Sequence, residues 1–468
     1  MSMKKKYDTT PFMKKASFFT LGCRLNFAET GGLSDLCRNK GHEIVSFGEE
    51  ADLTIINTCT VTDNADASCR NVIRKAIKAS PNGKIAVVGC FAQMAHRTLA
   101  TMEGVDLILG TAEKFKIFEY LEEITDREKT HSKAIVHIDK DTHFFPAATG
   151  LTGLEESQTR AFLKIQDGCN YVCSFCIIPF ARGRSKAITL DQVKEQTESL
   201  LSKGFKEIVL TGVNIGEYEQ TTGVKLSELV KILLSYPSLE RLRLSSIEPN
   251  TVTQDLLETL AVSKKSMPHF HLPLQSGSNK ILQIMKRKYT SEQYTSYLKM
   301  IHQYFPKASL GADIMVGHPG EGIEEFMETY DLTERLPLTH FHLFPYSPRQ
   351  LTVSKNLPDK VEEREKKRRI LLLSYLGQKK IKEYASHFLG KEIEVLWEQE
   401  KNGVWQGHSP HYLKVKLVSS DRKEKNLKNT LEKVKATQVS QEGELEATDL
   451  NLVKDLSSFK ESTNLIYA

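Results

Sequence analysis

Three short apolar runs near the start of the chain are each followed, one residue later, by a cysteine. The runs are residues 17–21 (SFFTL), 53–57 (LTIIN) and 85–88 (IAVV), and the cysteines are Cys23, Cys59 and Cys90. Cys59 follows Cys23 by 36 residues and Cys90 follows Cys59 by 31, about one strand–helix–strand unit each. Continuous apolar strands separated by helices predict a parallel sheet covered on both faces. Because the carboxyl ends of parallel strands meet at one edge, we expect the three cysteines to converge there.

A second trio of cysteines lies close together in the segment GCNYVCSFC. Its members are Cys169, Cys173 and Cys176, with C-x-x-x-C-x-x-C spacing. Thiolates bind iron–sulfur clusters readily, usually four to a 4Fe–4S unit. Three ligands leave one iron with an open position for a substrate, as catalytic zinc sites do. A zinc site is the alternative, although no further Cys or His lies within ten residues. Cys37 and Cys69 fall in helical stretches and are interpreted as small buried apolar residues.

From about residue 160 onward, apolar strands again alternate with helical stretches. The expected strands are residues 161–165, 207–211, 241–245, 269–272, 310–316 and 340–345. About six such repeats predict a barrel or partial barrel, whose active site lies at the carboxyl ends of the strands. The second cysteine trio follows the first of these strands, which is where such a barrel places its chemistry.

The pattern changes again after a charged helix expected from about Glu362 to about His387, whose EREKKRR run we interpret as a solvated face. Residues 393–397 and 412–417, joined by a turn at 401–403, have period two and predict a small all-β domain. The predicted division is a basic tail 1–15, a sheet domain 16–125, a linker 126–155, a barrel domain 156–385, a β domain 386–448 and a tail 449–468.

Composition narrows the class of protein without naming a function. The chain has 468 residues, 40% hydrophobic and 26% charged, with a net charge of +5; this fits about three globular domains and permits a nucleic-acid partner without indicating one. No apolar run reaches the roughly 20 residues of a membrane helix, and the basic N-terminus lacks the apolar stretch of a signal peptide. We therefore expect a cytoplasmic protein with no membrane partner, whose cysteines bind metal rather than form disulfides.

The second trio resembles the signature of the radical S-adenosylmethionine (SAM) superfamily. TLGCRLNFAET, INTCTVT and VGCFAQ look like the three N-terminal motifs of the methylthiotransferases within it, and RLRLSSIEP, HFHLPLQSGS with MKRKYT, ADIMVGHPGEG and HLFPYSPR also fit. The resemblance runs from about residue 17 to about residue 446. It implies an α/β protein with an N-terminal Rossmann-like parallel sheet, a central partial (β/α)6 radical SAM barrel and a small C-terminal TRAM-like β domain.

The resemblance also implies cofactors. Two 4Fe–4S clusters are expected, one held by the second trio with SAM on its open iron, and one held by Cys23, Cys59 and Cys90 that carries the sulfur. The residues implied to contact SAM are Phe175, Thr211, Gly212, Asn214, Gln275, Ser276 and Asp313. An electron donor such as flavodoxin or ferredoxin is an expected partner. Gly322 and His318 stand where the family usually has a threonine and an apolar residue, and both bear on how cofactor or substrate fits.

The expected substrate is the tRNA anticodon stem-loop. TLGCRLN with NTCTVT resembles most the subgroup that converts N6-threonylcarbamoyladenosine next to the anticodon into its 2-methylthio derivative. The alternatives are methylthiolation of isopentenyladenosine in tRNA or of an aspartate in a ribosomal protein, and a zinc-stabilised RNA-binding module without catalysis.

The TRAM-like region is the poorest match, above all at residues 420–438. Its candidate RNA contacts are lysines for phosphate and aromatic rings for bases: Lys391, Lys414, Lys416, Trp397, Trp405 and Tyr412. For each of them, a solvated lysine or a core aromatic residue is the alternative.

Overall fold

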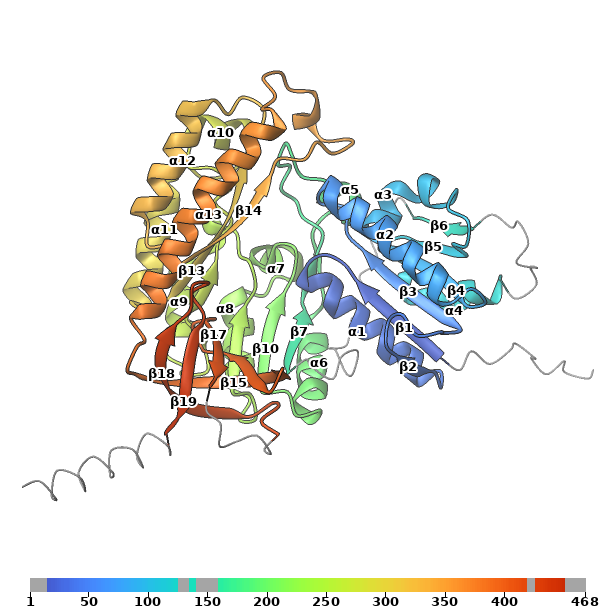
Figure 1. Cartoon of the computed structure of the whole chain (residues 1–468), viewed down its shortest axis with the longest axis horizontal. Helices are drawn as coiled ribbons and strands as arrows, with labels where there is room; N and C mark the ends of the chain where they lie inside the picture. The colour runs from blue at the N-terminus through green and yellow to red at the C-terminus, as the bar shows by residue number, and fades with distance from the viewer. Residues whose placement is uncertain (1–14, 125–133, 140–158, 419–425, 451–468) are drawn as a thin grey trace, which may run out of the picture.

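The computed structural model describes residues 15–124, 134–139, 159–418 and 426–450. Figure 1 shows an N-terminal sheet layer in blue, a central half-barrel in green to orange, and a small β-barrel in red at its lower edge. Almost all of the predicted tails 1–15 and 449–468, and most of the predicted linker, lie outside these residues. Within the described part, no helix combines the length and apolarity that crossing a membrane requires. The predicted domain boundaries stay predictions.

The N-terminal layer is a six-stranded parallel sheet in the order β2-β1-β3-β4-β5-β6. Its strands are β1 (Lys15–Thr20), β2 (Glu43–Val45), β3 (Leu53–Thr58), β4 (Lys84–Gly89), β5 (Leu107–Leu109) and β6 (Ile135–His137). The helices between them are α1 (Arg24–Asn39), α2 (Asp63–Ala79), α3 (Cys90–Leu99), η1 (Glu113–Lys116) and α4 (Ile117–Glu122). Ile55 packs into the apolar cluster on one face and Ile56 into that on the other, as the period of a strand buried on both faces requires.

Strand β6 lies within residues 126–155, the segment that the sequence predicts to be a linker. Ile135, Val136 and His137 pair in parallel with β5 and complete the sheet. The strand is short and half-exposed, so it carries too few apolar residues for a period to be recognised.

The central part contains the six expected strands, arranged as two three-stranded parallel sheets, β11-β10-β7 and β12-β13-β14. They are β7 (Arg160–Lys164), β10 (Glu207–Thr211), β11 (Arg241–Leu244), β12 (His269–His271), β13 (Ser309–Val316) and β14 (His340–Pro345). A bridge from Ser246 to His271 joins the two sheets, so the strands form one partial barrel. A short antiparallel pair, β8 (Gln166–Asp167) and β9 (Lys186–Ala187), flanks the second cysteine loop.

Helices cover the outside of the half-barrel (Figure 1): α6 (Leu190–Ser202), α8 (Leu226–Leu234), α9 (Gln254–Ala261), α11 (Ser291–Tyr304) and α12 (Ile323–Arg335). The short helix α5 (Ile178–Arg182) instead packs against α3 of the N-terminal layer. The other short elements between the strands are η2 (Ile215–Glu217), α7 (Tyr218–Thr222), η3 (Pro249–Thr251), α10 (Asn279–Ile284) and η4 (Val353–Asn356). Thr189 and Thr290 begin α6 and α11 with capping boxes closed by Gln192 and Gln293. Such boxes satisfy the free N–H groups of a first turn and fix where the helix starts.

Helix α13 (Glu363–Ser386) packs along β14 and carries the EREKKRR run. The prediction of a fully solvated face is wrong for two of its residues. Lys366 is buried and donates to the backbone oxygen of Tyr346 at 3.1 Å. Arg369 is also buried and donates to the carboxylate of Glu321 at 2.5 Å. Both buried charges have an anionic partner, Glu363 for Lys366 and Glu321 for Arg369, which is the condition for burying a charge. Arg369 holds the loop after β13, and Lys366 holds the residue that follows β14.

The C-terminal part is a closed barrel in the order β15-β16-β17-β19-β18. Its strands are β15 (Glu392–Lys401), β16 (Val404–His408), β17 (Lys414–Leu417), β18 (Leu431–Val439) and β19 (Leu445–Asp449). The turn predicted at 401–403 joins β15 to β16, a strand that the sequence interpretation missed. Trp397 and Trp405 belong to the barrel core, so the core alternative holds for both and neither is free to stack on a base.

Two of the predicted phosphate contacts in this barrel already have a partner. Lys414 and Lys416 both ion-pair with Glu444, at 2.7 and 2.5 Å. Lys391 is exposed. The poorly matched segment 420–438 contains all of β18 but its last residue, and β18 pairs with both β15 and β19. Residues 419–425 lie outside the described part.

Candidate active site

The first cysteine trio follows three neighbouring strands of the N-terminal sheet. Cys23 comes after β1, Cys59 after β3 and Cys90 after β4, and β3 lies between β1 and β4. Adjacent strands lie about 5 Å apart, so the three cysteines share one edge of the sheet. Burial raises the pKa of the Cys59 thiol to about 12, and its neighbours Cys90 and Cys23 add to the increase.

Glycine precedes two of these cysteines, and the local backbone requires it. Gly22 has a φ of +108°, and a Cβ there would lie 2.7 Å from the Cβ of Cys59. Gly89 has a φ of +98°, and a Cβ there would lie 2.5 Å from the side-chain oxygen of Asn57. A side chain at either position would meet both backbone strain and a clash. The two glycines therefore allow each strand to turn sharply into its cysteine.

The second cysteine trio lies on the loop between β8 and α5. Ser174, between its last two members, accepts a hydrogen bond from the hydroxyl of Ser354 at 2.8 Å. The hydroxyl of Ser354 lies 2.8 Å from Nε2 of His318. Burial lowers the pKa of His318 to about 4, so the imidazole is neutral at physiological pH. The histidine that departs from the family pattern thus helps to brace the cysteine loop.

Each trio has an arginine against one of its sulfur atoms. Nε of Arg182 lies 3.2 Å from Sγ of Cys90, and Nη1 of Arg287 lies 3.2 Å from Sγ of Cys173. Burial raises the pKa of both thiols, and the neighbouring guanidinium lowers it. A positive charge favours the thiolate, which is the form that ligates metal. The arginines lie 92 and 114 residues from their sulfur atoms, and sequence reasoning missed both.

A buried charge cluster joins the N-terminal sheet layer to the half-barrel. Glu29 of α1 accepts from three cations, at 2.5, 2.6 and 2.9 Å: Lys114, Lys164 and Arg182. Asp167 accepts from Lys164 at 2.8 Å and from Arg182 at 3.0 Å. Burial alone would raise the pKa of Glu29, but the cations outweigh it and hold that pKa well below its usual range. Because Arg182 also contacts Cys90, the cluster fixes the first trio relative to the barrel.

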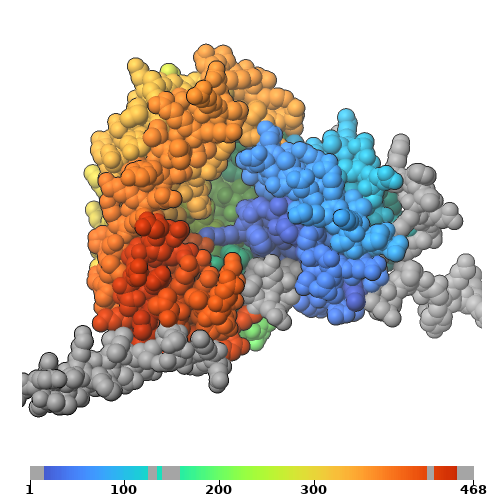
Figure 2. Space-filling view, in the orientation of Figure 1, coloured from blue at the N-terminus to red at the C-terminus, as the bar shows by residue number. Residues whose placement is uncertain are grey.

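A cavity of about 830 Å³ opens between the two cysteine trios. Cys23 of the first trio and Cys176 of the second both line it. Figure 2 shows the surface hollowed between the blue N-terminal layer and the orange and red parts of the chain. The volume lies in the range of roughly 300–1,000 Å³ that is usual for small-molecule sites. One cavity therefore borders both sets of candidate ligands.

Five of the residues predicted to contact SAM line this cavity. They are Phe175, Thr211, Gly212, Gln275 and Asp313. Gln275 has a φ of 66°, and its Oε1 is buried with no hydrogen-bond partner among the described residues. A buried polar atom without a partner is costly, so this wall fits a ligand that supplies polar groups.

The other two predicted SAM contacts, Asn214 and Ser276, are not among the residues that line the cavity. Asn214 is buried, and neither its side-chain oxygen nor its nitrogen has a partner in the described part. The hydroxyl of Ser276 lies 3.2 Å from that of Thr329 and accepts from the backbone of Ser278. The contact of both residues with SAM stays a prediction. The side chain of Asn214 has polar atoms without a partner, whereas the hydroxyl of Ser276 already has hydrogen-bond partners.

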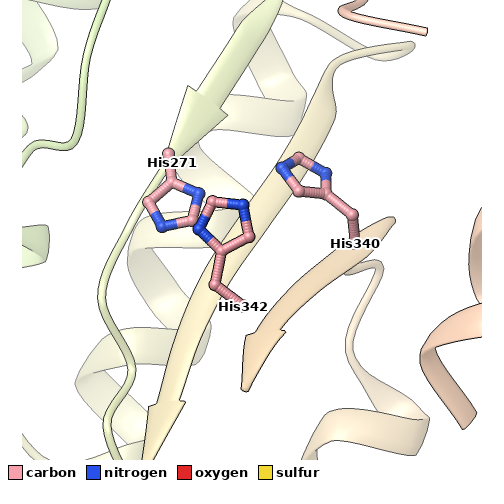
Figure 3. A group of neighbouring side chains, drawn as sticks. All are labelled: His271, His340 and His342. Atoms are coloured by element: carbon pink, nitrogen blue, oxygen red, sulfur yellow. The ribbon is translucent and has the colours of Figure 1, made fainter. Parts of the chain in front are cut away.

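Three histidines that sequence reasoning did not select gather beside the cavity (Figure 3). His271 on β12 and His340 on β14 flank Gly311 of β13 in register, and a Cβ at Gly311 would lie 2.2 Å from Nε2 of His340. Asp313 lies 2.8 Å from His271 and 3.3 Å from His342. Burial would raise the pKa of Asp313, but these two histidines hold it below its usual range. The repeated segment HFH, at 269–271 and 340–342, is the sequence signal for this group.

The cysteine sulfur atoms are too far apart for a single metal ion. Zn–S bonds of about 2.3 Å place the thiolates of one zinc ion within roughly 4 Å of one another. All eight cysteines are described. Among the described residues, ligand atoms that all lie within 4.8 Å of one another are found at His271, His340 and His342. Neither cysteine trio meets that limit. The described residues therefore give no support to a single zinc ion held by either trio, and the alternative of a zinc-stabilised module is not favoured.

Comparison with known proteins gives matches along most of the chain. The description "Radical SAM superfamily" matches residues 163–333, and "Uncharacterized protein family UPF0004" matches residues 15–110. Threonylcarbamoyladenosine tRNA methylthiotransferase MtaB of Aquifex aeolicus (strain VF5) is 39% identical over 387 residues, which cover 82% of this chain and 93% of that protein. The chain belongs to the radical SAM methylthiotransferase family. Membership implies 4Fe–4S clusters and SAM, and the two cysteine trios with the polar cavity wall fit both.

Further relatives of this methylthiotransferase carry two kinds of name. MtaB of Bacillus subtilis (strain 168) is 37% identical, covering 86% of this chain and 90% of that protein. The tRNA-2-methylthio-N(6)-dimethylallyladenosine synthase of Fusobacterium nucleatum subsp. nucleatum is 32% identical, covering 82% and 88%. Among solved structures, the radical SAM methyltransferase TsrM of Kitasatospora setae has a TM-score of 0.54 at 15% identity, covering 83% of this chain and 79% of that chain. This last likeness concerns the fold alone.

Proposed function

We propose that this methylthiotransferase transfers a methylthio group to the adenine ring of N6-threonylcarbamoyladenosine, next to the anticodon in tRNA. The names of the relatives from Aquifex aeolicus and Bacillus subtilis support this substrate. The observation that carries the proposal is the cavity bordered by both Cys23 and Cys176. The reaction breaks a C–H bond and inserts sulfur at the same carbon. The source of the radical and the source of the sulfur must therefore both face one substrate.

The two cysteine trios have different proposed roles at the two edges of the cavity. Cys169, Cys173 and Cys176 would hold the cluster that binds SAM, and Cys23, Cys59 and Cys90 would hold the second. When bound, these groups supply the radical that breaks an unactivated C–H bond and the sulfur that replaces the hydrogen. Arg182 and Arg287 favour the thiolate form of one ligand in each trio, and the charge cluster around Glu29 keeps the trios in a fixed relation.

The partners follow from the substrate. The tRNA anticodon stem-loop is proposed to enter the cavity from the hollow face in Figure 2. The chemistry also needs one-electron reduction, for which a flavodoxin or a ferredoxin is the proposed donor. The relative from Fusobacterium nucleatum, named for dimethylallyladenosine, keeps that nucleoside as the second candidate substrate.

The test separates the proposed roles of the two trios. In the wild-type protein, reconstituted anaerobically with iron and sulfide, we expect 5′-deoxyadenosine from SAM and the 2-methylthio nucleoside in tRNA. Cys59→Ala should still form 5′-deoxyadenosine but should give no methylthio product, whereas Cys173→Ala should form neither. Cys37→Ala is the matched control, since Cys37 is buried in the apolar cluster on one face of the sheet, and it should retain both activities.

Nucleoside analysis of tRNA from a deletion strain decides the substrate. We expect loss of 2-methylthio-N6-threonylcarbamoyladenosine with accumulation of its precursor, while methylthiolated isopentenyladenosine is unchanged. Full methylthiolation by Cys59→Ala, or loss of the isopentenyl product instead, would contradict the proposal.

A further inference from the structure

The charged side chains that line the cavity are paired with one another, with one exception. Arg160 lies 2.9 Å from the carboxylate of Glu398. Asp313 is paired with His271 and His342, as described above. Arg24 also lines the cavity, and among the described residues its side chain bonds to a hydroxyl group, that of Tyr412, and to no carboxylate. The wall therefore offers one guanidinium whose charge is not balanced by the protein.

The position of Arg24 is fixed from two sides. It directly follows Cys23 and begins α1, so its backbone moves with the first cysteine trio. Its Nη2 donates to the hydroxyl of Tyr412 at 2.8 Å, and its guanidinium carbon lies 5.2 Å from the centroid of the same ring. A guanidinium has five N–H donors, and this contact with Tyr412 uses one of them. The others remain for a ligand in the cavity.

The two candidate nucleosides differ in the charge of the group on N6. The threonylcarbamoyl group ends in a carboxylate, which is ionised at neutral pH because such carboxyl groups have a pKa of about 3.5. The dimethylallyl group is an uncharged hydrocarbon. Withdrawing an ionised carboxylate from water into a protein cavity costs free energy unless a cation meets it. Arginine meets a carboxylate especially well, through two parallel N–H···O hydrogen bonds.

We propose that Arg24 recognises the threonyl carboxylate of the substrate and thereby selects it over adenosines with an uncharged N6 group. This inference rests on the proposed function, because it assigns a part of the same substrate to a part of the same cavity. The guanidinium acts as a specificity residue. Its place beside Cys23 sets the distance between the carboxylate of the substrate and the trio proposed to deliver sulfur.

The test pairs a change in the enzyme with a change in the substrate. Two anticodon stem-loop RNAs are compared, one with the threonylcarbamoyl carboxylate and one with the corresponding neutral carboxamide. We expect wild-type kcat/KM for methylthiolation to favour the acid by about 10–100-fold, the range for a site that loses a charged hydrogen-bond partner. Arg24→Gln should lower kcat/KM for the acid by a similar factor and leave the carboxamide within about threefold. Arg24→Lys should recover part of the preference.

Controls separate recognition from damage to the neighbouring cluster. Arg24→Gln should keep wild-type iron and sulfide content and wild-type cleavage of SAM to 5′-deoxyadenosine. Arg74→Gln, an exposed position on α2, removes one positive charge outside the cavity and should keep the full preference for the acid. If Arg24→Gln with an intact cluster still favours the acid as strongly as the wild type, the inference is wrong. If the wild type methylthiolates neither RNA, the proposed function fails instead.

Discussion

Replacing Glu29 by glutamine tests how strongly the buried charge cluster holds the N-terminal layer to the half-barrel. Glu29 and Asp167 together face the cations Lys114, Lys164 and Arg182, and all five side chains are at most 4% exposed. The substitution changes the net charge of the cluster from +1 to +2 and leaves three cations with one carboxylate. Removing one partner from a buried ion pair costs about 3–5 kcal/mol. Glutamine keeps one acceptor oxygen, so we expect about 3 kcal/mol.

The measurement is urea unfolding of the iron-free protein, followed by circular dichroism. Glu119→Gln is the matched control, because Glu119 is exposed on α4 and such a substitution changes stability by less than about 0.5 kcal/mol. A loss below about 1 kcal/mol for Glu29→Gln would show that the cluster does not hold the two parts together as its contacts indicate.

The pH dependence gives an independent check on the same residue. The cations hold the pKa of Glu29 well below its usual range in the folded protein, although burial acts in the opposite direction. A carboxyl group whose pKa is lower when folded contributes its full stability above its unfolded pKa of about 4.3. It loses this stability progressively as the pH falls below that value toward the lower folded pKa. The stability gap between the wild type and Glu29→Gln should therefore narrow on acidification. A gap that is constant from pH 7 to pH 3 would contradict the ion-pair explanation.

Two further substitutions address the cysteine trios. Arg287→Gln removes the guanidinium 3.2 Å from Sγ of Cys173, and loss of such a supporting contact lowers metal affinity or activity by about 10–100-fold; unchanged iron content and unchanged SAM cleavage would argue against its role. Gly22→Ala places a Cβ 2.7 Å from that of Cys59 at a φ of +108°, and should reduce iron and sulfide to about half. Gly48→Ala is its control, with a φ of +103° and no atom within 4 Å, and should keep the full content.

The sequence predicted correctly the parts of this protein in which apolar runs recur in a regular pattern. Six central strands and the parallel N-terminal sheet follow from apolar runs that alternate with helices. The common edge of Cys23, Cys59 and Cys90 follows from the rule that parallel strands end on one side. In each case the spacing of residues along the chain was enough for the prediction, because the carboxyl ends of parallel strands lie at one edge of the sheet.

Local sequence patterns did not predict the contacts of the charge cluster or all the strands of the small barrel. Glu29 meets partners 85, 135 and 153 residues away, and no sequence spacing relates such distant residues. In strand β18 only Val434 and Ala436 are buried. The adjacent charges Glu432 and Lys433 and a register shift between Ala436 and Gln438 interrupt the alternation by which a strand is recognised. Trp405 was a candidate for stacking on bases, yet it packs inside the barrel, because a closed barrel of five strands needs large side chains to fill it.

The contact between Tyr412 and three arginines limits how this protein can be dissected. Tyr412 belongs to the C-terminal barrel, and its ring lies within 5.0–5.3 Å of the guanidinium carbons of Arg24, Arg160 and Arg243. Deleting the barrel would thus remove the aromatic ring that contacts Arg24 of the N-terminal layer and Arg160 and Arg243 of the half-barrel. A shortened protein that fails to modify RNA would not distinguish lost docking from a disturbed reaction chamber, so point substitutions are the informative route.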